Sequence, residues 1–216
     1  LQNLFLDDWR YCKNDNTPPR LYLENGYFPS PKICGNATIQ VVSSGPDSHV
    51  KKIEETFVKM ITSARERVYI QTPYFIPDDI FFSALRIAKR SGVDVRIMVP
   101  KIPDKKTVYM ATLSYLKEMA EMGIKVYLYN GFLHSKVMIV DDNKLSIGTC
   151  NTDNRSFALN FEDTVIIYSN ELNSEHQEIF KADIKQSQEV GINYFQKKRW
   201  ITKIFQALMR LMSSLF

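Results

Sequence analysis

Two kinds of apolar pattern alternate along the chain. Apolar positions in residues 50–64 and 108–122 recur at the i, i+3, i+4 spacing of amphipathic helices. Residues 68–71 and 93–99 instead form short apolar runs rich in β-branched side chains, which predict buried strands. Further strands are predicted at 37–42, 124–129 and 164–168, and further helices at 79–90 and 174–188. Because strands alternate with helices, we expect an α/β fold, a mixed β-sheet flanked by helices on both faces in an α-β-α sandwich.

A β-hairpin is predicted in the segment with the most reactive side chains. Residues 136–140 are apolar apart from Lys136 and end at the turn-like sequence DDNK, after which residues 144–148 form a returning strand. Side chains alternate between the faces of a strand, so His134 and Lys136 are expected to point the same way. The returning strand would bring Asn151 back towards His134, and the three polar groups would then surround one small anion.

These side chains suit the transfer of a phosphoryl group. A neutral imidazole at His134 can attack phosphorus, and an imidazolium can protonate a leaving alkoxide. Lys136 and Asn151 can hold the phosphoryl oxygens, and Glu162 would accept the second ring N–H of His134. A lone histidine is more often a hydrogen-bonded core residue, but a lysine on the same face argues against that interpretation, because lysine is rarely buried.

Some neighbouring residues are expected to have a structural role rather than a catalytic one. Asp141 lies at the predicted turn, where a carboxylate usually binds backbone N–H groups. Arg155 is expected to pair with Asp153 or Glu162 rather than with a phosphate. The loop at 72–77 contains two prolines and two aromatic residues, which suit either the edge of a lipid or phosphate cleft or an ordinary strand-to-helix connection.

At these residues the sequence resembles a known superfamily. The spacing His134-x-Lys136-x4-Asp141, followed by Thr149-x-Asn151, is similar to the HKD motif of the phospholipase D superfamily. The strings DNRSFALNFE at 153–162 and QTPYFIP at 71–77 resemble bacterial cardiolipin synthases more particularly. Thr149 stands where the superfamily often has serine, and both residues carry a hydroxyl group. The resemblance implies a phospholipase D-like sheet, with these catalytic residues: His134, Lys136, Asp141, Asn151 and Glu162. It also implies that Lys136, Asn151 and Thr149 bind the substrate.

The resemblance also implies an activity. Such an enzyme transfers a phosphatidyl group between two phosphatidylglycerol molecules through a phosphohistidine and releases glycerol, with no cofactor and no metal. The residues alone leave open whether His134 is the nucleophile or the general acid and base. In two-half relatives the histidine of the first half is usually the nucleophile, which would make His134 the acid and base.

Composition narrows the class of partner. The chain has 216 residues, 44% of them hydrophobic, and a net charge of +4, which suits an acidic partner without identifying it. Its three cysteines lack metal-ligand spacing and its three histidines are far apart, so no metal site is expected. Stacking of nucleic-acid bases is not expected, because Tyr127 and Tyr129 are better explained as one face of a strand. No apolar run approaches the ~20 residues that cross a bilayer.

Three regions are expected along the chain: a helix end and linker at 1–36, a phospholipase D-like domain at 37–190, and a basic amphipathic helix at 191–216. The last region begins with a basic cluster and Trp200, then presents a broad apolar face. It suits an anionic membrane surface or a second half of the protein. We therefore expect the chain at the cytoplasmic face of the cell membrane, with transmembrane segments outside this chain.

A weak internal repeat bears on the completeness of the site. Residues 2–9 can be laid over 177–184 with matching glutamine, phenylalanine and aspartate, and an equivalent of His134 would then lie roughly 40 residues before Leu1. We expect this chain to be a C-terminal half that needs an N-terminal HKD half in cis. One alternative is a homodimeric single-HKD phosphodiesterase of phospholipase D or nuclease type. The other is a non-catalytic lipid-binding module.

Overall fold

The computed structural model describes residues 1–14, 28, 32, 35–197 and 200–213, without the side chains of residues 201 and 203. Two compact units are present, residues 1–37 and residues 38–216. The first unit contains α1 (Gln2–Lys13), which ends where Asn14 adopts the left-handed conformation with φ 51°. Most of the predicted linker falls outside the described residues. None of the described helices is long and apolar enough to cross a membrane.

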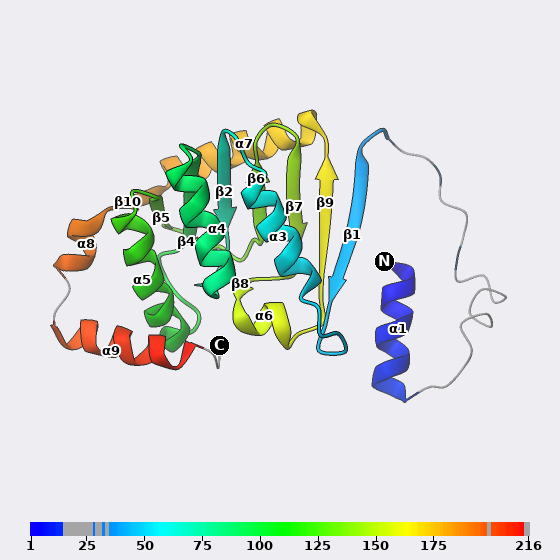
Figure 1. Cartoon of the computed structure of the whole chain (residues 1–216), viewed down its shortest axis with the longest axis horizontal. Helices are drawn as coiled ribbons and strands as arrows, with labels where there is room; N and C mark the ends of the chain where they lie inside the picture. Colours follow the sequence, from blue (N-terminus) through cyan, green and yellow to red (C-terminus); the bar gives the residue numbers. More distant parts are fainter. Residues whose placement is uncertain (15–27, 29–31, 33–34, 198–199, 214–216) are drawn as a thin grey trace. The chain divides into compact units, whose positions relative to one another are not determined.

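The second unit is built on a sheet of eight strands in the order β1-β9-β7-β6-β2-β4-β5-β10 (Figure 1). Strands β2, β4 and β5 are parallel to one another, and the other pairings are antiparallel. In chain order the strands are β1 (Thr38–Ser44), β2 (Arg67–Gln71), β4 (Asp94–Pro100), β5 (Lys125–Tyr129), β6 (Val137–Val140), β7 (Lys144–Gly148), β9 (Glu162–Tyr168) and β10 (Ser187–Val190).

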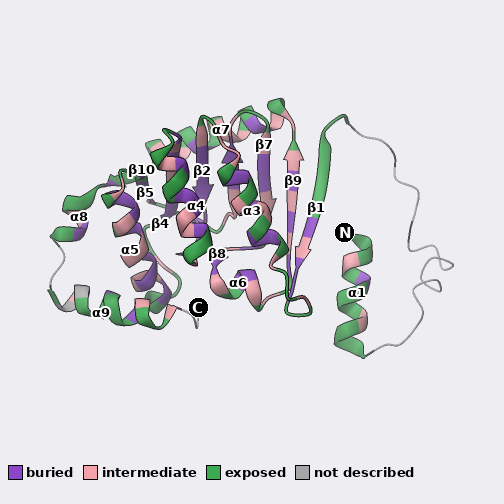
Figure 2. Cartoon of the chain, viewed as in Figure 1, coloured by how far each residue is buried: buried purple, intermediate pink, exposed green. Residues whose placement is uncertain are grey.

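Helices cover both faces of this sheet, which confirms the expected class. Figure 1 shows three helices on the near face, α3 (Lys52–Thr62), α4 (Asp79–Arg90) and α5 (Lys106–Glu121), and α7 (Asn170–Lys185) behind. The near core contains Ile53, Phe81 and Leu116, whereas the far core contains Tyr69 and Phe180, whose rings stack. Buried residues therefore fill the strands between the two helical layers (Figure 2).

Short elements lie at one end of the sheet. Strand β3 (Phe75–Ile76) pairs in parallel with β8 (Thr152–Asp153), which leads into α6 (Asn154–Ala158). Beyond β10 the described residues include α8 (Ile192–Gln196) and α9 (Trp200–Leu211).

The predictions were wrong at three boundaries. The helix predicted to reach residue 188 ends at Lys185, because residues 187–190 pair with β5 as an edge strand. The loop predicted at 72–77 contains β3. The helix predicted over residues 50–64 is α3, which begins at Lys52 and ends at Thr62.

Candidate active site

The sheet register gathers the predicted residues where β2 and β4 end. This border of strand ends is called the His134 edge of the sheet, and it is distinct from the edge strands β1 and β10. Strand β6 runs antiparallel to β2 with Val137 opposite Gln71, so the residues before Val137 lie where β2 ends. Strand β7 returns beside β6 with Ile147 opposite Val137, and the N–H of Gly148 donates to the carbonyl of Lys136 at 3.2 Å. The segment after β7 therefore arrives at the same edge.

His134 and Lys136 are in direct contact. The Lys136 Nζ lies 2.7 Å from both the Nδ1 and the carbonyl oxygen of His134. Burial lowers the pKa of Lys136, although the nearby carboxylates of Glu162, Asp104 and Asp153 act to raise it. The His134 side chain is exposed, and the ring of Phe132 stacks on it with the planes 5° apart. An imidazole and a half-buried cation thus face the open edge of the sheet together.

Asn151 lies in the short segment between β7 and β8. The backbone N–H of the next residue, Thr152, donates to the hydroxyl of Thr72 at 3.3 Å, which joins this segment to the end of β2. A cavity of about 10 Å³ is lined by residues of all three segments, Lys136, Thr72 and Cys150 among them. The Oδ1 of Asn151 is buried and has no hydrogen-bond partner within the described chain. An orphan amide oxygen at this edge is a group that a substrate hydroxyl can satisfy.

Glu162 is held by partners other than the expected histidine. One carboxylate oxygen accepts from the hydroxyl of Thr149, and the other accepts from the side-chain amide of Asn160 at 3.1 Å. The hydrogen bonds of the described residues contain no contact between Glu162 and His134. Glu162 instead acts on Lys136 through charge.

Thr149 already uses its hydroxyl within the protein. It donates to Glu162 and accepts from the backbone N–H of Asp163 at 3.0 Å. The carbonyl of Asp163 accepts from the N–H of Thr149 at 2.9 Å, which closes the pairing of the two chain segments. These contacts favour a positioning role for Thr149 over direct substrate binding.

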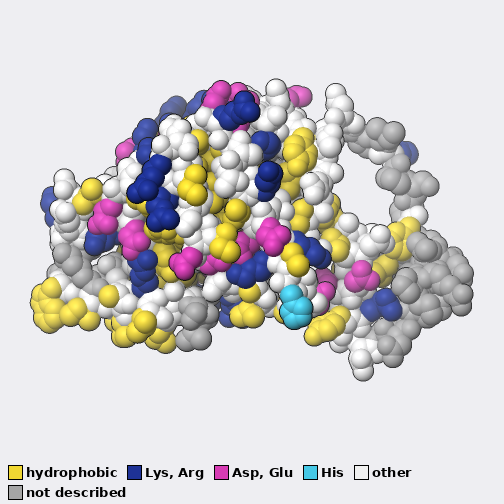
Figure 3. Space-filling view, viewed as in Figure 1, with side chains coloured by type: hydrophobic (Ala, Val, Ile, Leu, Met, Phe, Trp, Pro, Cys, Tyr) yellow, Lys and Arg dark blue, Asp and Glu magenta, His cyan; other side chains and the backbone are white. Residues whose placement is uncertain are grey.

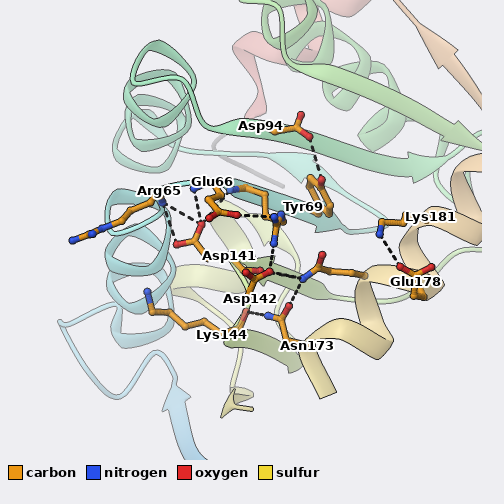
Figure 4. A network of polar contacts seen from close by, with 12 residues as sticks. Arg65, Glu66, Tyr69, Asp94, Asp141, Asp142, Lys144, Asn173, Glu178 and Lys181 are labelled. Atoms are coloured by element: carbon orange, nitrogen blue, oxygen red, sulfur yellow. Dashed lines mark hydrogen bonds and ion pairs between the residues drawn. The ribbon is translucent and has the colours of Figure 1, made fainter. Parts of the chain in front are cut away.

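Asp141 lies at the opposite end of β6 from His134. Its carboxylate accepts from the backbone N–H groups of Arg65, Glu66 and Arg67 at 2.8 to 3.1 Å, as Figure 4 shows. Its backbone has φ 50°, in the left-handed region that aspartate tolerates better than most residues. This position does not support the implied catalytic role, because the carboxylate ties the turn to the start of β2.

Arg155 makes a different contact from the one expected. Its Nε donates to the side-chain oxygen of Asn160 at 3.4 Å, whereas Asp153 caps α6 by accepting from the N–H of Ser156 at 2.7 Å. The predicted pairing of Arg155 with an acidic residue is therefore wrong. Through Asn160, Arg155 still supports Glu162 indirectly.

Two neighbours of the site were missed from the sequence. Asp104 follows β4, hydrogen-bonds the hydroxyl of Tyr74, and acts on Lys136 through its charge. Phe132 was not considered as a partner of His134. A signal for Asp104 existed, because parallel strands β2 and β4 deliver their carboxyl ends to the same edge. Among the described residues, no group of three or more histidine, cysteine or acidic side chains is gathered to hold a metal ion.

Comparisons with known proteins identify the family of this chain. Residues 57–184 match the family model described as "Cardiolipin synthase, PLD-like domain". The chain is 41% identical to cardiolipin synthase 2 of Bacillus anthracis over 216 residues, covering 100% of the chain and 41% of that protein. It is 39% identical over 214 residues to cardiolipin synthase of Listeria welshimeri, covering 99% of the chain and 44% of that protein. The chain thus spans less than half the length of these curated relatives.

Solved structures support the fold. The phospholipase D family member Nuc of Salmonella typhimurium superposes with a TM-score of 0.63 at 23% identity, covering 72% of this chain and 99% of that one. Phosphatidylserine synthase of Haemophilus influenzae superposes with a TM-score of 0.70 at 15% identity, covering 91% of this chain and 53% of that one. At these identities the likeness establishes the architecture alone.

Proposed function

Because this chain belongs to the cardiolipin synthase family of phospholipase D-like domains, we propose that it supplies one half of a phosphatidyltransferase active site. The observation that carries the proposal is the contact of 2.7 Å between Lys136 and His134 at an exposed sheet edge. A cation beside an imidazole suits a phosphodiester, since one group holds the phosphoryl oxygens while the other exchanges a covalent bond or a proton.

The proposed reaction has two steps. A histidine nitrogen attacks the phosphorus of one phosphatidylglycerol, and the bond to the glycerol headgroup breaks. A second histidine protonates the departing glycerol oxygen. That histidine then takes the proton from a hydroxyl of a second phosphatidylglycerol, whose oxygen attacks the phosphohistidine and yields cardiolipin with the first histidine free.

Each residue of the site has a proposed role. We assign His134 to proton transfer, since the family resemblance gives the nucleophile to the other half, and we assign Lys136 and Asn151 to the phosphoryl oxygens. Glu162 and Thr149 position the segment that carries Asn151, as their mutual hydrogen bond supports. Asp141 is removed from the catalytic set.

The nucleophilic histidine is proposed to come from an N-terminal HKD half in the same polypeptide. The length of the relatives, of which this chain covers 41% and 44%, supports that partner. A second copy of this chain is the other possible donor. The substrates would lie in an anionic cell membrane, and this location follows from the phospholipid that the family acts on.

The decisive experiment uses the complete polypeptide with phosphatidylglycerol vesicles. Cardiolipin and glycerol should form in equal amounts, and His134→Ala should lower both by at least about 10³-fold. The matched control is His49→Ala, because His49 is an exposed histidine in the loop before α3. Unchanged cardiolipin output from His134→Ala would remove this residue from catalysis. Turnover by the 216-residue chain as a monomer would contradict the need for a partner half, and turnover by a dimer would favour the second copy.

A further inference from the structure

One side of helix α9 packs against its own domain. Met209 is buried in a cluster with Ile76, Val108 and Ala111. Arg210 forms an ion pair with Glu118, and its guanidinium also lies over the ring of Tyr115, 4.5 Å from the ring centroid. The charge and the buried residues of this side face α5.

The opposite side of α9 is apolar and open. Residues three and four positions apart share a helix face, so Trp200, Ile204, Leu208 and Leu211 form one stripe, with exposures of 69%, 58%, 49% and 82%. Phe205 and Met212 extend it. We call these six residues the α9 apolar face. Figure 3 shows hydrophobic side chains gathered along the lower left edge, where Figure 1 draws this helix.

The α9 apolar face lies at the same edge of the sheet as His134. The buried Met209 contacts the cluster that includes Ile76 in β3, and β3 pairs with β8 directly after Asn151. In Figure 1, α9, β8 and α6 all lie at the end towards which β2 points. A planar partner that covered α9 would therefore also meet the entrance to the candidate site.

Basic residues flank this apolar face. The sequence KKR at 197–199 precedes α9 directly. Lys101, Lys105 and Lys106, all exposed, surround the start of α5 at the same edge. Lysine and arginine beside an apolar helix face attract anionic headgroups, and a tryptophan at the helix start suits the boundary between headgroups and acyl chains.

We propose that the α9 apolar face inserts into the surface of an anionic bilayer and holds the His134 edge of the sheet against it. The proposal deepens the proposed function, on which it rests only for the lipid nature of the substrate. A membrane fits better than a protein partner, because an open apolar stripe is combined with the exposed Lys101, Lys105 and Lys106 at the same edge, and anionic lipids neutralise such charges.

Vesicle binding of the 216-residue chain tests this proposal without any turnover. The wild type should co-sediment with vesicles of equal phosphatidylglycerol and phosphatidylcholine, and at least about tenfold less with phosphatidylcholine alone. The double variant Leu208→Glu/Leu211→Glu should lose binding to the anionic vesicles. Its matched control is Ile87→Glu, since Ile87 is 55% exposed in the last turn of α4, away from this edge.

A second measurement keeps the result independent of folding defects. In a Trp9→Phe background Trp200 is the remaining tryptophan, and its emission should shift to the blue when anionic vesicles are added. His134→Ala should bind vesicles like the wild type even if it abolishes turnover, which separates this proposal from the proposed function. Equal vesicle binding by the double variant and the wild type would overturn the proposal. A Trp200 signal that is already blue-shifted in the lipid-free complete polypeptide, with its other tryptophans replaced, would do so too, because protein would then cover the face.

Discussion

The phenyl ring of Phe132 lies parallel to the imidazole of His134, with 6.0 Å between the ring centroids and 5° between the planes. Phe132 is itself 87% exposed, so it contributes little to the core. Its main contact with the candidate site is this stacking, which restricts the orientations that the imidazole can adopt.

Replacing Phe132 should therefore affect turnover more than stability. Stacking of this kind is worth about 0.5–1.5 kcal/mol, so Phe132→Ala should lower kcat of the complete enzyme by about 2- to 12-fold. Phe132→Tyr keeps the ring and should retain most activity. Steady-state kinetics together with melting temperatures would check this, and equal kcat for the alanine variant and the wild type would show that the stacking has no role.

Lys136 should be needed for its charge. We expect Lys136→Met to lower kcat by about 10²- to 10³-fold, the usual loss when one donor to a developing oxyanion is removed. Lys181→Met, on the exposed surface of α7, is the matched control. A retained kcat in Lys136→Met would exclude phosphate binding by this side chain.

The pH dependence provides a second test of Lys136. Burial lowers its pKa below the ordinary 10.5, so the ammonium loses its proton at a lower pH than an exposed lysine does. Turnover should decline on the alkaline side before pH 10.5. Lys136→Arg, whose charge persists, should move that decline to higher pH, and an unmoved alkaline limb would assign the decline to another group.

Asp141 should matter for stability rather than for turnover of the folded enzyme. Asp141→Asn tolerates the same left-handed backbone but weakens the bonds to three backbone N–H groups, at a cost of about 1–3 kcal/mol in the free energy of unfolding. Denaturant titration would measure this loss, with Asp47→Asn in the exposed turn after β1 as the control. An unchanged unfolding midpoint would contradict the structural role.

The carboxylate of Asp141 also predicts a dependence on acid. Burial raises its pKa, but hydrogen bonds from the N–H groups of Glu66, Arg67 and Arg65 lower it by more than that. The resulting pKa lies below the ordinary 3.8. A lowered pKa in the folded state stabilises the protein above the ordinary pKa, and this stabilisation is lost as pH falls through the folded value. Unfolding of the wild type should steepen below about pH 4, and Asp141→Asn should lack that component.

Glu54 should give stability the opposite dependence on pH from that of Asp141. Burial and the neighbouring Asp78 raise its pKa and Lys51 at 3.0 Å opposes both, which together place the pKa at about 7. A raised pKa favours the folded state while the carboxyl is protonated, so stability should fall as pH rises through about 7. Glu54→Gln should be more stable than the wild type at pH 8.5, by on the order of 2 kcal/mol, and nearly equal at pH 5. Melting curves at both pH values, with the exposed Glu55→Gln as control, would reveal a pH-independent difference if this explanation is wrong.

Local sequence patterns were sufficient for much of the fold. The apolar run before Asp141 and the turn after it predicted the β6–β7 hairpin, because a short run rich in β-branched residues and a polar turn sequence are both local signals. The contact between His134 and Lys136 agrees with the expected shared face, although both residues lie just before β6 and not on the strand. The helix predicted at 79–90 has the observed bounds, and Asp78 caps it by accepting from the N–H groups of Ile80 and Phe81.

Features that depend on distant partners could not be predicted in this way. The edge strand β10 has the polar sequence SQEV, and only its pairing with β5 makes it a strand. Glu162 was expected to reach His134, but Thr149 and Asn160 lie closer once β7 and β9 are paired. The partners of a side chain thus depend on the register between paired strands. This register cannot be inferred from the spacing of residues along one strand.

The place of the β6–β7 hairpin within the sheet has a consequence for local unfolding. Both strands are internal, with β2 on one side and β9 on the other, so their amide protons can exchange with solvent only when much of the sheet opens. The residues just before β6, which carry His134, extend beyond the ladder. Amide exchange should therefore change from fast to slow within a few residues between Phe132 and Met138, so that a freely accessible reactive group is attached directly to the slowest-opening part of the domain.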